Sequence, residues 1–266
     1  MRRLAVMVCL VACRMGFDPV ANEARDGSTG MADGTTSPTD ALAFGPIASW
    51  GFDEAGQAVT DLAGSLDGVL GATAAVEARD PQRTTTPTRV CTGSALTFDG
   101  LDDVVTISNP SPANLSRFAI GFSMVADGDG GGTLPRIFTK EDGAGPDVIV
   151  HFRAADNAIA VNIFNTTDTL HATFGAGVVR GTRANWVVSY DDAGDRRIHI
   201  YKNGVETNYL RQDAMTGTLK TTTANWRIGN QASGVRGFDG TIDAIAVYDV
   251  PFGATEAAAL SASCPP

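Results

Sequence analysis

Acidic side chains gather at one turn of the sequence. The stretch ALTFDGLDDVVTI, residues 95–107, places Asp99 before a turn glycine and puts Asp102 and Asp103 directly before the next strand-like run. Carboxylates that meet on a loop can act as general acids and bases, can bind a hard cation such as Ca²⁺, or can accept hydrogen bonds from nearby backbone N–H groups. The sequence favours the last two roles for Asp102 and Asp103 and leaves the choice between them open.

The motifs that usually carry catalysis are missing from the sequence. It contains no G-x-S-x-G, H-E-x-x-H or C-x-x-C pattern, so serine-hydrolase and zinc chemistry have no support. Two histidines do lie two positions from another polar residue, His151 with Arg153 and His199 with Tyr201. Each pair shares one face of a strand. Simple exposure of that face to solvent explains such a pair without any catalytic role. We therefore predict that the protein is not an enzyme.

Aromatic side chains are the groups that would stack on sugar rings. Trp50, Trp186 and Trp226 all lie in strand-like runs, where burial in the core is the expected role. Better candidates for an exposed ligand-binding face are Tyr201, His199 and Tyr209.

Short strands and turns must position these residues. Apolar residues alternate with others in DVIVHFR (147–153), IAVNIF (159–164) and NWVVSY (185–190). The run RRIHIYKNG (196–204) ends in Asn203-Gly204, a strong hairpin signal, and helical periodicity is limited to a short turn at Ala254–Leu260. The pattern predicts an all-β sandwich of two antiparallel sheets.

Charge and the first residues indicate where the protein works. The sequence has 20 basic and 30 acidic residues and a formal net charge of −10, which argues against a nucleic-acid partner. After Met1-Arg2-Arg3 comes an apolar run that is too short to span a bilayer. The run ends in Leu10-Val11-Ala12-Cys13, which resembles a bacterial lipobox. We expect residues 1–12 to be a signal peptide and Cys13 to carry the lipid; an ordinary signal-peptidase cut is the alternative.

The next segment is rich in Gly, Ser, Thr, Asp and Pro. We expect residues 13–43 to be a flexible tether and residues 44–266 to form the domain. Cys91 and Cys264 remain within the domain. In an oxidising compartment the simplest role of such a pair is a disulfide, and two unrelated thiols are the alternative.

Several stretches in order carry a family resemblance. They are WGFDE (50–54), DLAG (61–64), ALTFDGLDDVV (95–105), FAIGF (118–122), NWVV (185–188), IYKNG (200–204) and FDGTID (238–243). Together they resemble the concanavalin A-like lectin/glucanase superfamily, in its bacterial laminin G-like branch. The resemblance implies a jelly-roll sandwich in which the first and last strands lie side by side.

The resemblance also implies chemistry at the loops. Related domains bind calcium at loop acids, and adjacent terminal strands would let Asp53 and Asp61 meet Asp243, with Asp102 and Asp103 as a second candidate site. The glucanases of this fold carry an E-x-D-x-E strand, which this sequence lacks. Polysaccharide lyases of the fold use a His/Tyr pair with Arg and Gln, of which His151, Arg153, His199 and Tyr201 are a superficial match.

These observations predict an exported, lipid-anchored, non-catalytic domain of the cell envelope. We expect it to bind a glycan or another surface ligand, with Ca²⁺ as a cofactor and with membrane contact through the lipid alone; full secretion is the alternative location. A protein–protein adhesion or structural envelope role is the alternative function, and a polysaccharide lyase or glycosidase is the less favoured one.

Overall fold

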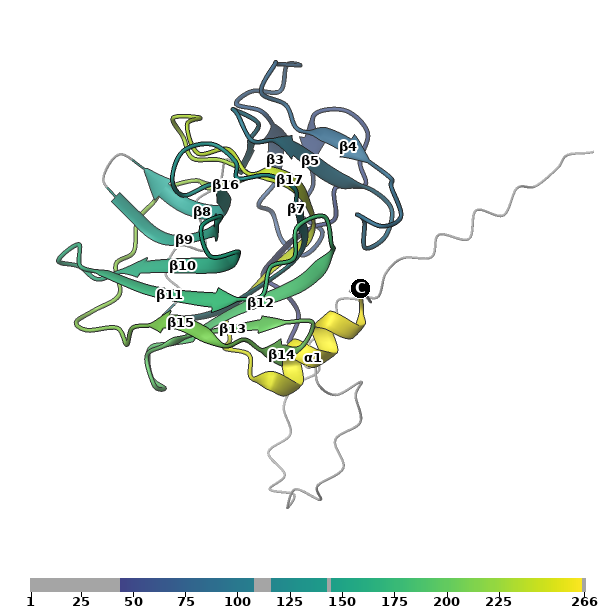
Figure 1. Cartoon of the computed structure of the whole chain (residues 1–266). Coiled ribbons are helices and arrows are strands. Elements are labelled where there is room, and N and C mark those ends of the chain that lie inside the picture. Colours follow the sequence, from purple (N-terminus) through teal and green to yellow (C-terminus); the bar gives the residue numbers. More distant parts are fainter. Residues whose placement is uncertain (1–43, 108–115, 143–144, 265–266) are drawn as a thin grey trace, which may run out of the picture.

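Two antiparallel sheets face each other and enclose the core (Figure 1). The computed structural model describes residues 44–107, 116–142 and 145–264. In the described residues, the eight-stranded sheet runs in the order β14 (Val205–Glu206), β13 (Ile198–Lys202), β12 (Ala184–Asp191), β7 (Arg117–Ala126), β17 (Asp239–Tyr248), β5 (Ala95–Asp99) and β4 (Gln82–Thr84), with β1 (Ala48–Trp50) also paired to β17.

The second sheet has nine strands in the described residues. Its order is β15 (Tyr209–Gln212), β11 (Leu170–Ala176), β10 (Ala158–Phe164), β9 (Gly145–Arg153), β8 (Arg136–Asp142), β16 (Trp226–Ile228), β6 (Val105–Ile107), β3 (Gly68–Leu70) and β2 (Ala58–Val59). The predicted all-β sandwich of two antiparallel sheets is therefore confirmed.

The first and last strands of the domain lie side by side. β1 pairs antiparallel with β17, in a register that sets Trp50 opposite Ile245. The expected hairpin at Asn203-Gly204 joins β13 to β14, and both turn residues have positive φ, 49° and 80°. Asn and Gly suit that conformation because they tolerate the left-handed region that a tight hairpin turn requires.

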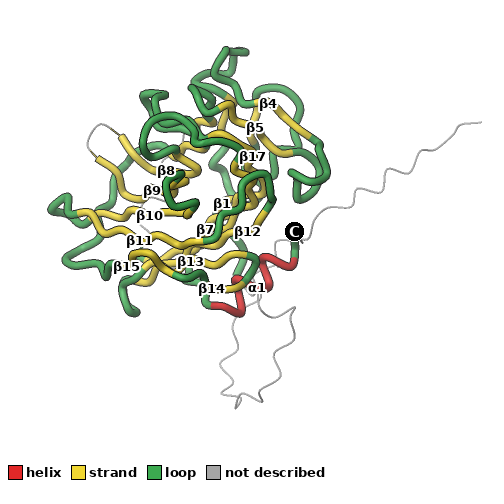
Figure 2. Tube along the Cα trace, viewed as in Figure 1, coloured by secondary structure: helices red, strands yellow, loops and turns green. Residues whose placement is uncertain are grey.

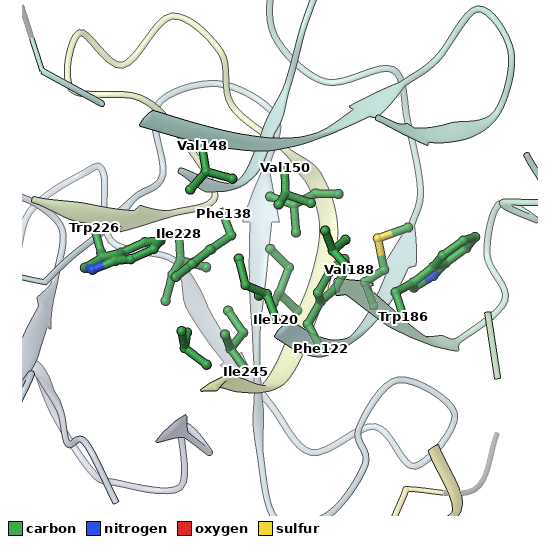
Figure 3. Close-up of a cluster of buried hydrophobic side chains, with 14 of the residues drawn as sticks. Ile120, Phe122, Phe138, Val148, Val150, Trp186, Val188, Trp226, Ile228 and Ile245 are labelled. Carbon is green, nitrogen blue, oxygen red and sulfur yellow. The ribbon is translucent and has the colours of Figure 1, made fainter. Parts of the chain in front are cut away.

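Apolar side chains from both sheets meet between them. Figure 3 shows Ile120 and Phe122 of β7 on one side of the core and Val148 and Val150 of β9 on the other. Phe138 also lies in this layer. Each such side chain stabilises the fold by about 1.5–3 kcal/mol when it is fully buried.

The three tryptophans belong to this core. Trp50, Trp186 and Trp226 are each at most 4% exposed, and Trp226 stacks on Phe138 with a centroid distance of 4.6 Å. Their predicted burial is confirmed. None of them can stack on a sugar at the surface, so any aromatic contact to a ligand must come from another residue.

The outer face of the eight-stranded sheet is covered. Helix α1 (Ala254–Ala262), drawn red in Figure 2, packs Ala257 and Leu260 against a second apolar cluster on this face. Next to it the loop between β4 and β5 crosses the same sheet, and the Cys91–Cys264 disulfide joins that loop to the chain end after α1. The predicted disulfide is thus confirmed, and it closes this face of the sandwich.

Candidate functional site

The turn after β5 brings three carboxylates together. Ligand oxygens of Asp99, Asp102 and Asp103 all lie within 4.8 Å of one another. Asp103 is buried and its Oδ2 accepts a hydrogen bond from the N–H of Asp99 at 2.9 Å. Burial raises the pKa of Asp103 to about 6, and the charges of Asp99 and Asp102 add to this. The predicted pair is therefore a trio, which can both shape the turn and attract a cation.

Two further carboxylates, Asp53 and Asp243, lie near the disulfide. Asp243 is 1% exposed, and its two oxygens accept hydrogen bonds from the N–H groups of Cys91 (2.6 Å) and Ala244 (2.7 Å). Burial raises the pKa of Asp243 to about 7, with a further contribution from the nearby charge of Asp53. Asp53 in turn accepts a hydrogen bond from the N–H of Ser94 at 2.6 Å. Asp53 is thus close enough for its charge to act on Asp243, and a cation shared by the two remains a prediction.

Asp61 is engaged by the backbone on both of its oxygens. Its Oδ1 accepts hydrogen bonds from the N–H groups of Ser49 and Ala63, and its Oδ2 accepts one from Leu66, all at 2.9–3.0 Å. Both oxygens of this buried carboxylate are thus engaged by the backbone of the loop after β1. Asp61 fixes that loop, and its part in a metal site remains a prediction.

The three predicted sugar-binding residues separate in the structure. Tyr201 is 5% exposed and lies in the apolar cluster under α1, so the expectation that it lines an open face is wrong. His199 and Tyr209 instead meet at Glu206 Oε1, with hydrogen bonds of 2.7 and 2.6 Å. Burial works to raise the pKa of Glu206, but the bonds from Tyr209 and His199 outweigh it and the pKa is lowered. This network ties β13, β14 and β15 together at the sheet edges.

The outer face of the nine-stranded sheet carries a different polar group. Phe174 of β11 and Arg211 of β15 are paired neighbours, and Arg153 of β9 projects from the same face. The guanidinium carbons of Arg153 and Arg211 lie 4.5 and 5.8 Å from the centroid of the Phe174 ring. We call these three residues the arginine–phenylalanine stack. Both arginine side chains reach solvent, with 38% and 47% of their surface exposed.

A buried histidine lies on the same face as this stack. His151 of β9 is 1% exposed and pairs across the sheet with Arg136 of β8. Burial and the positive charge of Arg136 lower the pKa of His151 to about 3, so the ring is neutral at ordinary pH. Arg136 itself forms an ion pair with Glu141 at 3.1 Å. His151 is therefore buried beneath this face, and it is not the solvent-facing residue that the sequence suggested.

Sequence reasoning did not select Phe174 or Arg211 as site residues. Phe174 falls in the run LHATFGA, whose neighbours are small residues, and nothing local distinguishes it from a core aromatic. The sheet order places β15 beside β11, which is what brings Arg211 to Phe174. Arg153 was selected, but as a partner of His151.

Known proteins define the class of this fold. A model of the concanavalin A-like lectin/glucanases superfamily, of the laminin G type, matches residues 98–258. The chain belongs to this family. No curated protein matches it.

Solved structures of similar fold come from proteins of several kinds. Domain 4 of AbnA, a GH43 extracellular arabinanase from Geobacillus stearothermophilus solved with arabinotriose, has a TM-score of 0.57 at 16% identity, over 81% of this chain and 98% of that one. The binding domain of Paraclostridial Mosquitocidal Protein 1 has a TM-score of 0.60 at 12% identity, over 81% and 51%. Trypanosoma rangeli sialidase with 2,3-difluorosialic acid has a TM-score of 0.56 at 12% identity, over 81% of this chain but 32% of its own length. This chain therefore spans about a third of the sialidase, and the likeness shows the fold alone.

One prediction concerns the start of the chain. Cys13, the predicted lipid attachment site, lies outside the described residues. Among the residues that the structure describes, no helix is long and apolar enough to cross a membrane.

Proposed function

We propose that this protein is an exported, non-catalytic carbohydrate-binding module. The observation that carries the proposal is that the outer faces of the two sheets differ in what covers them. α1 and the disulfide-linked loop cover one sheet, whereas the other sheet presents the exposed arginines and the aromatic ring of the arginine–phenylalanine stack. Planar rings and fixed hydrogen-bond donors that reach the surface suit the binding of sugar chains. The sugar-bound arabinanase domain of the same fold supports this choice.

Two observations favour binding over catalysis. A general acid or base must reach the reacting group in a protonation state that suits the task. His151 is buried with a pKa of about 3, and Tyr201 lies under α1, so one residue of each lyase-like pair is withdrawn from a polymer at the surface. The module would thus hold its ligand without changing it.

Export to an oxidising compartment is part of the same proposal. The Cys91–Cys264 disulfide supports it, because disulfides persist outside the reducing cytosol. We propose that Cys13 carries a lipid that anchors the domain to a membrane of the cell envelope. Replacing Cys13 with Ser should release the protein from membranes and abolish its labelling by a lipid precursor. Full membrane retention of the variant would refute the anchor.

We also propose that Ca²⁺ binds at loop carboxylates. The Asp53–Asp243 pair fits a divalent cation, because a buried carboxylate with a raised pKa beside another acid is a site whose repulsion a cation relieves. The trio of Asp99, Asp102 and Asp103 fits by the closeness of its oxygens. Asp53 and Asp243 would hold the cation in the first case and the trio in the second, and in both it would fix the loops.

Thermal unfolding with calcium or with a chelator tests the cation. A ligand that binds only the folded state stabilises it by about 2.7 kcal/mol when its concentration is about 100 times Kd. Asp243→Asn and Asp102→Asn are matched variants, one for each candidate site. The variant that loses the calcium response identifies the site. A wild-type melting curve that calcium and chelator leave unmoved would exclude both sites.

Binding to glycans tests the function itself. We expect the purified full chain to bind at least one polysaccharide on a glycan array or in affinity electrophoresis, and to release no product from it. If the protein binds no glycan but captures a single envelope protein, the result would favour the adhesion role instead. Product release would contradict the non-catalytic proposal.

A further inference from the structure

The arginine–phenylalanine stack places two guanidinium groups around one ring. The chain carries a formal net charge of −10, and this part of the nine-stranded sheet presents two exposed guanidinium groups, each paired with an aspartate. Their carbons lie 4.5 and 5.8 Å from one ring centroid, and therefore within about 10 Å of each other. Two fixed cations at this spacing can contact two anionic groups of one ligand.

Each guanidinium is oriented by an acid and keeps donors for a ligand. Nε of Arg153 donates to Asp156, and in the described residues its two terminal nitrogens have no hydrogen-bond partner. Nε and Nη2 of Arg211 donate to Asp213, whose Oδ2 also accepts from the N–H of Ala172 at 3.0 Å. The terminal nitrogens of Arg153 form the planar fork that matches a carboxylate or a sulfate.

The ring of Phe174 supplies the rigidity that such a contact needs. Arginine side chains lose about 2 kcal/mol of rotamer freedom when a ligand fixes them. Stacking on Phe174 and pairing with Asp156 and Asp213 restrain both guanidiniums before the ligand arrives. Preorganisation of this kind strengthens binding without any new contact.

We infer that the arginine–phenylalanine stack binds the charged groups of an anionic polysaccharide. The inference rests on the proposed carbohydrate-binding function and names the class of its ligand. Arg153 and Arg211 contact carboxylates or sulfates on successive parts of one chain. Because the two guanidinium carbons lie within about 10 Å of each other, both can contact charged groups on neighbouring sugar rings of one chain.

Paired polymers that differ only in charge test the inference. The probes are polygalacturonate against its methyl ester, and dextran sulfate against dextran, each titrated into the full chain. The test variant is Arg153→Gln/Arg211→Gln, which removes both exposed guanidiniums. The control is Arg89→Gln, which removes an arginine–aspartate pair, Arg89 with Asp127, beside the opposite sheet. Both variants should keep the wild-type melting temperature, because exposed ion pairs contribute little to stability.

The expected result is a preference for the charged polymer of at least tenfold. This preference should fall as salt rises, should vanish in Arg153→Gln/Arg211→Gln and should persist in Arg89→Gln. A preference within the first pair identifies carboxylates, and one within the second identifies sulfates. Equal binding of charged and neutral polymers, or equal losses in both variants, would overturn the inference and leave the proposed function standing. Binding to no glycan at all would refute the proposed function, and the inference with it.

Discussion

The buried histidine of the nine-stranded sheet should make the protein sensitive to acid. His151 is 1% exposed and lies beside Arg136, so a proton on its ring would be both desolvated and close to a positive charge. The perturbation is a drop in pH, compared between the wild type and a His151→Gln variant. Glutamine keeps a polar side chain of similar size but cannot take up the proton.

The magnitude follows from the two pKa values of His151. The pKa is 6.5 in the unfolded chain and about 3 in the folded protein. As the pH falls below 6.5, the unfolded chain binds the proton first, so the free energy of unfolding decreases until the folded state is protonated near pH 3. Each pH unit crossed costs about 1.4 kcal/mol, so the loss at about pH 4 is about 3 kcal/mol.

Urea unfolding followed by tryptophan fluorescence measures this loss. The wild type should lose about 3 kcal/mol more than His151→Gln between neutral pH and about pH 4. The comparison cancels the effect of other groups that titrate in this range. His199→Gln, which removes a partly exposed imidazole, is the matched control. Equal pH dependence of the wild type and His151→Gln would show that His151 is not held neutral by the fold.

Two further predictions concern stability. Reduction of the Cys91–Cys264 disulfide, whose cysteines are 173 residues apart, should lower the free energy of unfolding by about 3–5 kcal/mol; an unchanged urea midpoint after reduction would contradict the predicted constraint. Gly229→Ala should destabilise by about 2–4 kcal/mol, because φ is +82° and the new Cβ would lie 2.0 Å from the buried ring of Phe98. Gly181→Ala, with φ of +69° and open space around it, should cost only about 1–2 kcal/mol, and equal melting temperatures of the two variants would refute the packing argument.

Local patterns were enough to predict the fold. Alternation along β9, β10 and β12 fixed which side chains face the core, and Asn203-Gly204 fixed a hairpin, because both signals act over a few residues. The Cys91–Cys264 pair was predicted by elimination in an oxidising compartment. These features need no knowledge of which strands become neighbours.

The candidate site depends on the order of strands in the sheet, and local sequence patterns do not predict that order. Tyr201 and His199 share one strand face as predicted, but α1 covers Tyr201 and leaves His199 partly exposed. Phe174 and Arg211 lie far apart in the sequence, and β15 must add to the edge of β11 before they meet. The hydrogen bonds of Asp61 to Ser49 and Leu66 likewise could not be predicted, because they depend on how the loop after β1 folds.

Glycan binding by the full chain is the most direct test of the account. Isothermal titration of the wild type and of Arg153→Gln/Arg211→Gln with the best polysaccharide from an array should give saturable binding without product release, and binding at least tenfold weaker in the variant. A wild type that binds no glycan, or one that degrades the polymer, would contradict the central claim that this laminin G-like sandwich is a non-catalytic carbohydrate-binding module.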